Sequence, residues 1–391
     1  MNTNKTILIR NGRLIDPLHQ RDGIQDLLIS DGKVAAIGPS LKDVADLEVD
    51  ATGCVVVPGL LDVHAHHFYG TEDRFLSNGP FSVAPDGFTF RSGVTTAVDF
   101  GGPGWKNIEL FRRNIVERSK TRILALINIL GEGMSGEPWE QDITDMDPEK
   151  TAKAAKENND IVVGVKLAHY LKPEWTPTER TVEAGRIANI PVAIDFGGDD
   201  RYAPLSIETL FMDKLRPGDI YTHVYADLKR REQIVDASTG KLKPFVWEAR
   251  KKGVLFDLGH GGYSFAFSQA IPALAEGFLP DAISTDLHTF SMNEAMKDMM
   301  NVISKMMALG MSMYEVVKAS TSDAAAMIRR PELGHLGIGA EADVAVLSIR
   351  EGRFGFTDVL GQKIIGSQKL ECELTIRSGE VVYDLNGMTI Q

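Results

Sequence analysis

Two histidines one residue apart, His64 and His66, directly follow an apolar segment of strand length, residues 60–63. Successive side chains of a β-strand point to opposite faces, so residues two apart share a face and both imidazoles can point the same way. Neutral imidazole is the most common metal ligand among side chains, and two on one face can chelate a single ion. This pair therefore predicts a metal site where the segment ends.

Four further apolar segments each contain or end in one ionisable residue. These residues are Lys166 in IVVGVKL, Asp195 in VAIDFGG, His223 in YTHVY and Asp286 in ISTDLH. A buried charge without a partner is costly, so each needs a structural or chemical reason. A single polar residue in a strand is commonly a hydrogen-bonded core group. Together with the histidine pair, however, the set favours one shared metal site.

Eight apolar segments of strand length recur through the middle of the chain and would position these residues. They are nearly continuous in Val, Ile and Leu, as expected for parallel strands buried on both faces. Amphipathic stretches at 108–118, 178–188 and 207–215 alternate with them and predict helices. Such alternation indicates a (β/α)8 barrel, a TIM barrel, whose strand ends carry the chemistry. The eight segments are 60–63, 94–100, 123–129, 161–167, 192–196, 220–225, 254–258 and 282–285.

Both ends of the chain have a different pattern of short strands separated by tight turns. Asn11-Gly12 and Asp31-Gly32 separate strand-like segments at the start, and Ser378-Gly379 does so near the end. We therefore expect an α/β protein in which a small β-sandwich domain is formed from both chain termini. The predicted division is 1–56 plus 337–391 for the composite sandwich, and 57–336 for the (β/α)8 barrel.

Composition narrows the class of protein. Of 391 residues, 43% are hydrophobic and 25% charged, which is typical of a globular protein. The net charge of −12 argues against binding to nucleic acid or to an anionic membrane. Two cysteines provide no disulfide framework, and neither a signal peptide nor a membrane span is evident. We expect a cytoplasmic enzyme with a small-molecule substrate, forming a homo-oligomer as most enzymes of this size do.

Several motifs carry a resemblance to a known family. VVVPGLLDVHAHH resembles the signature of the amidohydrolase superfamily, whose members are metal-dependent hydrolases on a (β/α)8 barrel. GIGAEADVAVLSI is similar to the segment in which their chains return to the small sheet domain. More narrowly, RSGVTTAVDFGGPG, VVGVKL, FDLGHGGYSF and GFLPDAISTDLH resemble the amidohydrolase/deacetylase branch near dihydroorotases and D-aminoacylases. The resemblance covers essentially the whole chain.

This resemblance implies a binuclear metal centre. His64 and His66 would bind the first ion, and His223 the second. Lys166, carbamylated by CO2, would bridge the two, because carbamylation turns its ammonium into an anionic oxygen ligand. Asp286 would bind the first ion and transfer protons as the catalytic residue. The two divalent ions are expected to be Zn, with Mn or Fe as alternatives that suit oxygen ligands.

The sequence departs from the resembled family at the fifth segment, where the family usually has histidine and this chain has Asp195. Carboxylate oxygen coordinates divalent cations at about 2.0–2.2 Å, so a ligand is retained. Aspartate is shorter and adds a negative charge, which predicts a less electrophilic and more weakly held second metal. His169, three residues after Lys166, is an alternative imidazole, although a histidine at a strand end more often orients a ligand than binds the ion.

Substrate contacts are expected in two loops. His260 lies among glycines in Gly259-His260-Gly261-Gly262, and Gly261 and Gly262 would let a ligand approach the backbone closely. Tyr69 and Arg74 follow the first barrel segment and could contact a substrate carboxylate.

The reaction expected from these residues is attack of a metal-bridging hydroxide on an amide or ester carbonyl. We therefore expect a deacetylase or other deacylase that acts on a small carboxylate-bearing compound. The same centre would equally serve a cyclic-amide hydrolase of the dihydroorotase or hydantoinase type. A non-catalytic scaffold on the same fold is a third interpretation, which only the departure at Asp195 favours.

Overall fold

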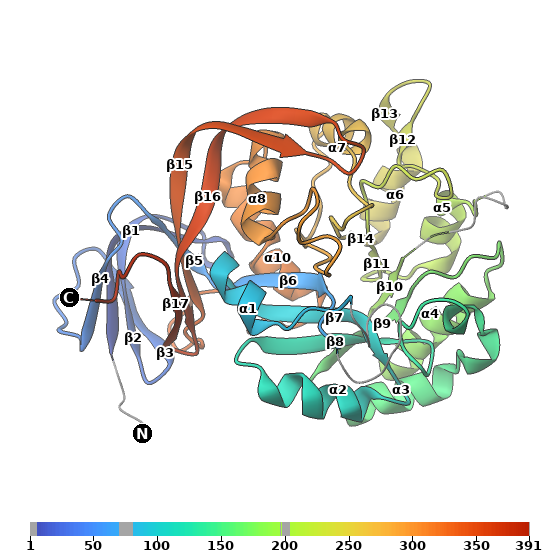
Figure 1. Ribbon diagram of the computed structural model, residues 1–391, viewed down its shortest axis with the longest axis horizontal. Helices are drawn as coiled ribbons and strands as arrows, with labels where there is room; N and C mark the ends of the chain where they lie inside the picture. The colour runs from blue at the N-terminus through green and yellow to red at the C-terminus, as the bar shows by residue number, and fades with distance from the viewer. Residues whose placement is uncertain (1–5, 70–80, 196, 198–203, 391) are drawn as a thin grey trace.

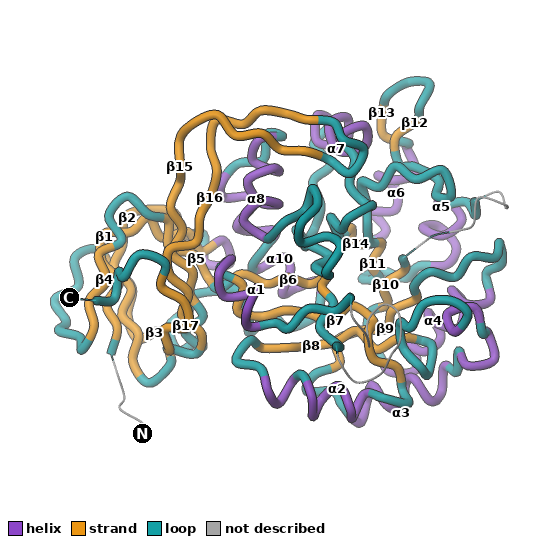
Figure 2. The backbone as a smooth tube through the Cα atoms, viewed as in Figure 1, coloured by secondary structure: helices purple, strands orange, loops and turns teal. Residues whose placement is uncertain are grey.

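The structure is a computed structural model that describes residues 6–69, 81–195, 197 and 204–390. Its strands form two large sheets (Figure 2). One sheet is parallel and flanked by helices, and the other collects strands from both ends of the chain (Figure 1). A short hairpin, β12 (Val235–Asp236) and β13 (Lys241–Leu242), pairs separately.

The parallel sheet has seven strands in the order β14-β11-β10-β9-β8-β7-β6. Almost every residue in these strands is buried, which explains why the segments are nearly continuous in Val, Ile and Leu. Seven of the eight predicted segments are therefore confirmed as strands. Their bounds are β6 Leu60–Ala65, β7 Val94–Gly104, β8 Arg122–Asn128, β9 Val162–Leu167, β10 Val192–Ile194, β11 Ile220–Tyr221 and β14 Leu255–Phe256.

The eighth predicted segment, 282–285, is not a regular strand but lies between the two edges of this sheet. Ala282 forms a parallel bridge with Asp257, beside β14, and Leu287 forms one with Ala65, at the end of β6. The Asp286 amide also donates to the His64 carbonyl at 2.7 Å. The two edge strands of the sheet, β6 and β14, therefore both lie next to this segment.

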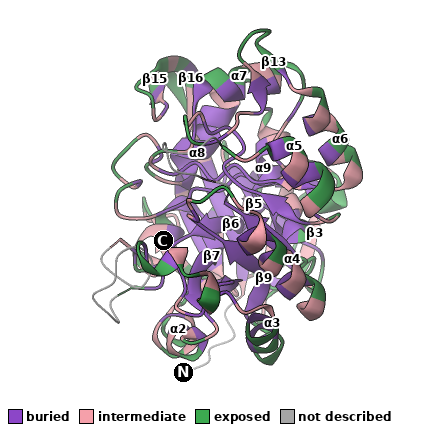
Figure 3. Ribbon diagram, turned by 90° about the vertical axis from the view of Figure 1, so that its right-hand side faces the viewer, coloured by how far each residue is buried: buried purple, intermediate pink, exposed green. Residues whose placement is uncertain are grey.

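Helices cover the outside of the parallel strands, with buried inner faces and exposed outer faces (Figure 3). The predicted helix at 108–118 ends at Asn114 and continues as a 3-10 turn, Val116–Arg118. In the described residues no helix is both long and apolar enough to cross a membrane. The α-helices are α1 Asp86–Thr89, α2 Ile108–Asn114, α3 Pro148–Glu157, α4 Thr176–Ala188, α5 Ile207–Thr209, α6 Pro244–Lys252, α7 Phe267–Ala275, α8 Met299–Ala308, α9 Met313–Ala319 and α10 Ser322–Met327.

The second sheet combines N-terminal and C-terminal strands, which lie side by side in blue and red in Figure 1. Its order is β17-β16-β15-β5-β1-β2-β3, with β4 pairing to β1. Continuous hydrogen bonding joins all eight strands into one sheet, whereas a sandwich has two. The division at 56/57 and 336/337 stays a prediction. The strands are β1 Ile7–Asp16, β2 Arg21–Ser30, β3 Lys33–Gly38, β4 Leu47–Asp50, β5 Val55–Pro58, β15 Val344–Thr357, β16 Lys363–Arg377 and β17 Glu380–Asp384.

The long hairpin β15–β16 extends from this sheet across α8 toward α7 (Figure 1). The Leu370 amide donates to Ser304 Oγ on α8 at 2.9 Å. At the tip of the hairpin, Asp358 Oδ2 accepts from the Phe267 amide at 3.0 Å, and the Val359 amide donates to the Phe265 carbonyl at 3.1 Å. The C-terminal strands therefore support the segment that follows the Gly259–Gly262 loop.

A buried carboxylate fixes the backbone just after the histidine pair. Asp99 in β7 is completely buried, and its Oδ2 accepts from the amides of His67 and Phe68 at 2.7 and 2.9 Å. Its Oδ1 accepts from the Gly102 amide at 2.6 Å. This residue holds the start of the loop after β6 against the end of β7.

Replacing Asp99 with alanine leaves three buried backbone donors without an acceptor. We expect Asp99→Ala to lower the free energy of unfolding by about 3 kcal/mol, measured by urea denaturation. Asp160→Ala, which removes an exposed carboxylate paired with Arg112, should cost less than about 1 kcal/mol. Equal losses in the two variants would contradict the anchoring role of Asp99.

Candidate metal centre

All six residues predicted to bind metal line one cavity of about 630 Å³ at the carboxyl ends of the parallel strands. The histidine pair lies at the end of β6, Lys166 near the end of β9, and Asp195 and His223 just after β10 and β11. Asp286 follows the bridging segment 282–285. Parallel strands place their carboxyl ends at the same edge, so residues far apart in sequence meet there. The six are His64, His66, Lys166, Asp195, His223 and Asp286.

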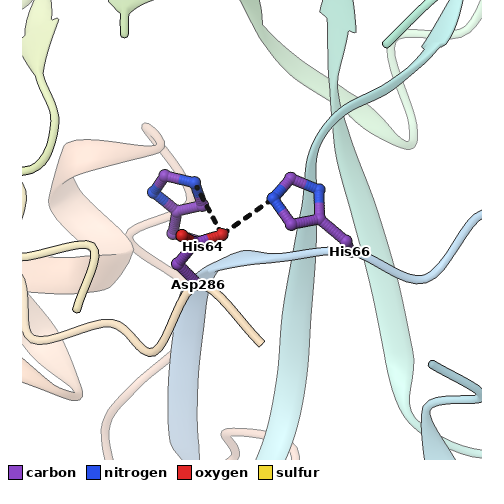
Figure 4. Close-up of side chains that lie close together, drawn as sticks. All are labelled: His64, His66 and Asp286. Atoms are coloured by element: carbon purple, nitrogen blue, oxygen red, sulfur yellow. Dashed lines mark hydrogen bonds and ion pairs between the residues drawn. The ribbon is translucent and has the colours of Figure 1, made fainter. Parts of the chain in front are cut away.

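Three of them form a compact group, shown in Figure 4. His64, His66 and Asp286 are buried, and each offers a ligand atom within 4.8 Å of the other two. Asp286 Oδ1 lies 2.9 Å from His66 Nε2 and 3.6 Å from His64 Nε2. Both imidazoles thus face the same carboxylate oxygen, as the two-residue spacing predicted.

The orientation of His64 is set by groups behind it. Its Nδ1 lies 3.0 Å from Asp257 Oδ2 and 2.9 Å from Thr222 Oγ1. The hydroxyls of Thr222 and Ser284 donate to Asp257 at 2.6 and 2.5 Å, so this carboxylate is held on both oxygens. Sequence analysis missed Asp257, although it is a lone polar residue in the seventh apolar segment.

Electrostatics keep this group ready to bind a cation. Burial, with the nearby Lys166, lowers the pKa of His64 to about 3, so its imidazole is neutral at physiological pH. Burial opposes ionisation of Asp286, but His64, His66 and His288 outweigh it and hold the pKa of this carboxyl well below its usual range. The group therefore offers two imidazoles and an anionic carboxylate.

Lys166 is almost completely buried in β9. Its Nζ lies 3.5 Å from Asp195 Oδ2 and 4.2 Å from the centre of the Phe100 ring, which also stacks on His64. Burial lowers the pKa of Lys166, although the carboxylates of Asp195 and Asp286 oppose the shift.

Asp195 follows β10 and has a partner that sequence analysis did not find. Arg231 is buried, and its Nη2 donates to Asp195 Oδ1 at 2.5 Å. Burial raises the pKa of Asp195, but His223, Lys166 and Arg231 outweigh this and hold it well below its usual value. Arg231 belongs to an Arg-Arg pair in a loop, which carries no recognisable motif.

Glycines allow the loop after β14 to pack directly on the centre. His223 Nδ1 lies 2.6 Å from the Gly259 carbonyl, which leaves Nε2 facing Asp195 Oδ2 at 3.3 Å. A Cβ on Gly259 would lie 2.7 Å from His223 Nδ1, and one on Gly261 would lie 2.4 Å from Asp286 Oδ2. Both glycines also have left-handed backbones, so side chains are excluded by conformation and by space.

The predicted substrate residues are more dispersed. Gly262 lines the cavity, whereas His260 is completely buried and is not among the described lining residues. Tyr69 is 39% exposed and also lies outside that lining. Arg74 lies outside the described residues. Their contacts with substrate stay predictions.

The residues of the first group fit a divalent cation. The Asp257 carboxylate accepts from His64 Nδ1, so Nε2 keeps its lone pair and faces Asp286 Oδ1. A second ring nitrogen, His66 Nε2, faces the same oxygen. With both rings neutral and these lone pairs facing the carboxylate, the acceptor atoms repel one another, and a cation placed among them would relieve the repulsion. A carboxylate behind a metal-binding imidazole is also the usual arrangement in metal sites.

Comparison with known proteins agrees with this geometry. A family profile described as "Amidohydrolase family" matches residues 267–383. A deacetylase from Agrobacterium fabrum is 32% identical over 345 residues, which cover 86% of this chain and 81% of the relative. The chain belongs to the amidohydrolase family. This confirms the predicted superfamily, and with it a hydrolase rather than a scaffold.

Solved structures of related enzymes cover nearly the whole of this amidohydrolase. One described as an adenine deaminase superimposes with a TM-score of 0.86 at 28% identity, covering 97% of this chain and 99% of that one. One described as a dihydroorotase gives 0.85 at 29% identity, with the same coverage. Family members with different activities therefore share this architecture.

A buried lysine explains the position of His260. Lys305 Nζ, on α8, lies 2.6 Å from His260 Nε2 and donates to the Ala295 carbonyl at 2.9 Å. His260 also stacks on Phe265, with ring centres 4.6 Å apart. Burial lowers the pKa of Lys305 from 10.5 to about 7. The contact between Lys305 and His260 thus holds the Gly259–Gly262 loop in place from the side of α8.

The lowered pKa of Lys305 predicts a pH-dependent stability. Between pH 7 and 10.5 the unfolded chain keeps a proton on this amine that the folded chain has released, so stability rises with pH in this window. Lys305→Met should reduce the slope of the free energy of unfolding against pH in this window by up to about 1.4 kcal/mol per pH unit. Urea denaturation at several pH values measures it. The exposed Lys153→Met is the control, and identical slopes in the original chain and Lys305→Met would refute a neutral buried amine.

Proposed function

We propose that this amidohydrolase is a metal-dependent deacetylase or deacylase acting on an amide or ester of a small carboxylate-bearing compound. The observation that carries the proposal is the buried group of His64, His66 and Asp286 at the floor of a cavity of about 630 Å³. A cavity of that size suits a small molecule. The relative named deacetylase, similar over most of its length, supports the reaction class.

The proposed ligands of the first cation are His64, His66 and Asp286, with Lys166, Asp195 and His223 holding a second. Zinc is the default for this mixture of nitrogen and oxygen ligands, and Mn or Fe are alternatives. When bound, a divalent cation polarises the substrate carbonyl and lowers the pKa of water toward about 7. The lowered pKa of Lys166 supports carbamylation, because CO2 reacts with the neutral amine.

Asp286 is the proposed proton carrier. Its carboxylate stays ionised at neutral pH because the surrounding imidazoles stabilise the charge. It is therefore available to accept a proton from the attacking water and deliver it to the leaving nitrogen or oxygen. The loop at Gly262, which lines the cavity beside it, would pack against the substrate.

A carboxylate on the substrate suits the outer wall of the cavity. Arg230 lines this wall and is exposed, and in the described part of the chain it forms no ion pair. Its neighbour Arg231 is committed to Asp195. Arg230 is thus an exposed guanidinium of the described lining that would bind an anionic group, and Arg74, which lies outside the described residues, stays a prediction.

Cyclic-amide hydrolysis is the second candidate, because the structure described as a dihydroorotase matches nearly the whole chain. The same proton carrier and carbonyl chemistry serve both reactions. We also propose that segment 282–287 closes the parallel strands into the (β/α)8 barrel, supported by its bridges to both edges of the sheet.

Assaying a panel of N-acetyl amino acids, O-acetyl hydroxy acids, dihydropyrimidines and adenine tests the reaction class. We expect release of acetate from an acetylated acid, loss of activity after chelation, and recovery with Zn or Mn in bicarbonate. Asp286→Asn should lower kcat at least about 100-fold. Turnover of the cyclic substrates alone would favour the second candidate, and activity insensitive to chelation would refute the proposed metal dependence.

Arg230→Gln tests recognition of the carboxylate. We expect KM for the substrate found in the panel to rise about tenfold with little change in kcat, because the contact is made equally in the ground and transition states. Lys229→Gln removes an adjacent exposed cation that does not line the cavity and should leave KM unchanged. Equal KM values in the two variants would show that Arg230 does not bind the substrate.

A further inference from the structure

Three nitrogen atoms, from β9, from the loop after β9 and from the segment after β11, surround one oxygen of Asp195. Oδ2 of this residue lies 3.3 Å from His223 Nε2, 3.5 Å from Lys166 Nζ and 3.5 Å from His169 Nε2. The other oxygen, Oδ1, is held by Arg231. Arg231 therefore fixes the carboxylate from behind, so that its free oxygen points toward the nitrogen atoms.

His169 is oriented toward this oxygen by a buried acid. Its Nδ1 lies 3.1 Å from Glu140 Oε2, and both residues line the cavity. Glu140 is 1% exposed, and its Oε1 has no hydrogen-bond partner in the described structure. A buried carboxylate whose hydrogen bond goes to one imidazole fixes the tautomer of that imidazole. Asp257 has the same relation to His64 on the other side of the centre.

Both imidazoles near Asp195 consequently present an acceptor. The Gly259 carbonyl accepts from His223 Nδ1, and Glu140 accepts from His169 Nδ1, so in the neutral rings each Nε2 carries a lone pair. These lone pairs face a carboxylate oxygen. Carbamylation of Lys166 would add another anionic oxygen at the same place. With the rings neutral, a cation placed among these acceptors would be bound by all of them.

We infer that His169, oriented by Glu140, replaces the imidazole that Asp195 has displaced from the end of β10. The second cation position is then formed by His169, His223 and the Oδ2 of Asp195, with the carbamate of Lys166. Arg231 acts as a positioning residue for Asp195 and offsets part of its charge. The inference deepens the proposed function and rests on it for the metal centre and for the second-cation ligands Lys166, Asp195 and His223.

The geometry also accounts for the change at the fifth segment. Aspartate is shorter than histidine, so a cation bound to it alone would lie closer to β10 and farther from His223. An imidazole that enters from the loop after β9 fills the vacated space from the cavity side. The left-handed backbone of His169, with φ of 52°, turns its side chain out of the strand direction.

Metal content of the purified chain tests the inference without an activity assay. Protein produced with bicarbonate and without chelator is analysed by elemental analysis, and the dissociation constant of the second equivalent is measured by competition with a chromogenic chelator. We expect about two equivalents for the original chain and about one for His169→Ala. Glu140→Gln, which preserves the volume of the side chain, should raise the dissociation constant of the second metal equivalent about 10- to 100-fold.

His335→Ala is the matched control, because it removes an imidazole that packs on His19 beside the other sheet. It should retain about two equivalents. Thermal unfolding checks that each variant folds. If His169→Ala does not fold, the dissociation constant measured for Glu140→Gln tests the inference instead. Two metal equivalents per chain in His169→Ala, or an unchanged dissociation constant of the second metal ion in Glu140→Gln, overturn the inference. Neither result contradicts the proposed hydrolase function. One equivalent in the original chain also overturns it, whereas none overturns the proposed function as well.

Discussion

Lys166 is buried near the carboxyl end of β9, so the charge of its amine, when protonated, has to be balanced within a few ångströms. Asp195 provides that balance from the next strand, and Arg231 holds Asp195 from the loop beyond it. On the opposite side, Asp286 is stabilised by His64 and His66. Because the partners come from different strands, none is satisfied until the parallel sheet has formed in register. The same pairing that stabilises the fold therefore assembles the centre.

The residues of the centre could be predicted because they interrupt otherwise apolar segments. A histidine pair or a lysine within a run of Val, Ile and Leu is a local signal, and strand periodicity fixes the face on which it lies. Seven apolar segments became strands for the same reason. The segment at 282–285 did not, because it bridges two sheet edges through isolated pairs and through Asp286, whose backbone is left-handed.

The supporting residues could not be predicted, because their roles depend on contacts distant in sequence. Asp257 reaches His64 across 193 positions, Arg231 reaches Asp195 from an irregular loop, and Glu140 lies in a 3-10 turn before β9. No spacing rule connects them. His260 is expected from its glycine-rich surroundings to contact substrate, whereas the structure buries it against Lys305 and outside the described cavity lining, so that contact stays a prediction. Tertiary packing, rather than local pattern, determines which polar residues reach the cavity.

The β15–β16 hairpin secures residues 265–267 through Asp358, which lies 91 positions beyond Phe267. Every proposed cation ligand precedes position 287, so a growing chain carries all of them well before the segment that steadies the cavity wall has been synthesised. Flexible imidazoles and carboxylates bind divalent cations in order of intrinsic affinity, whereas a finished cavity imposes distance and geometry. During synthesis the proposed ligands are therefore present before the hairpin that completes the cavity around them. The proposed cation ligands are accordingly enclosed only in the completed chain.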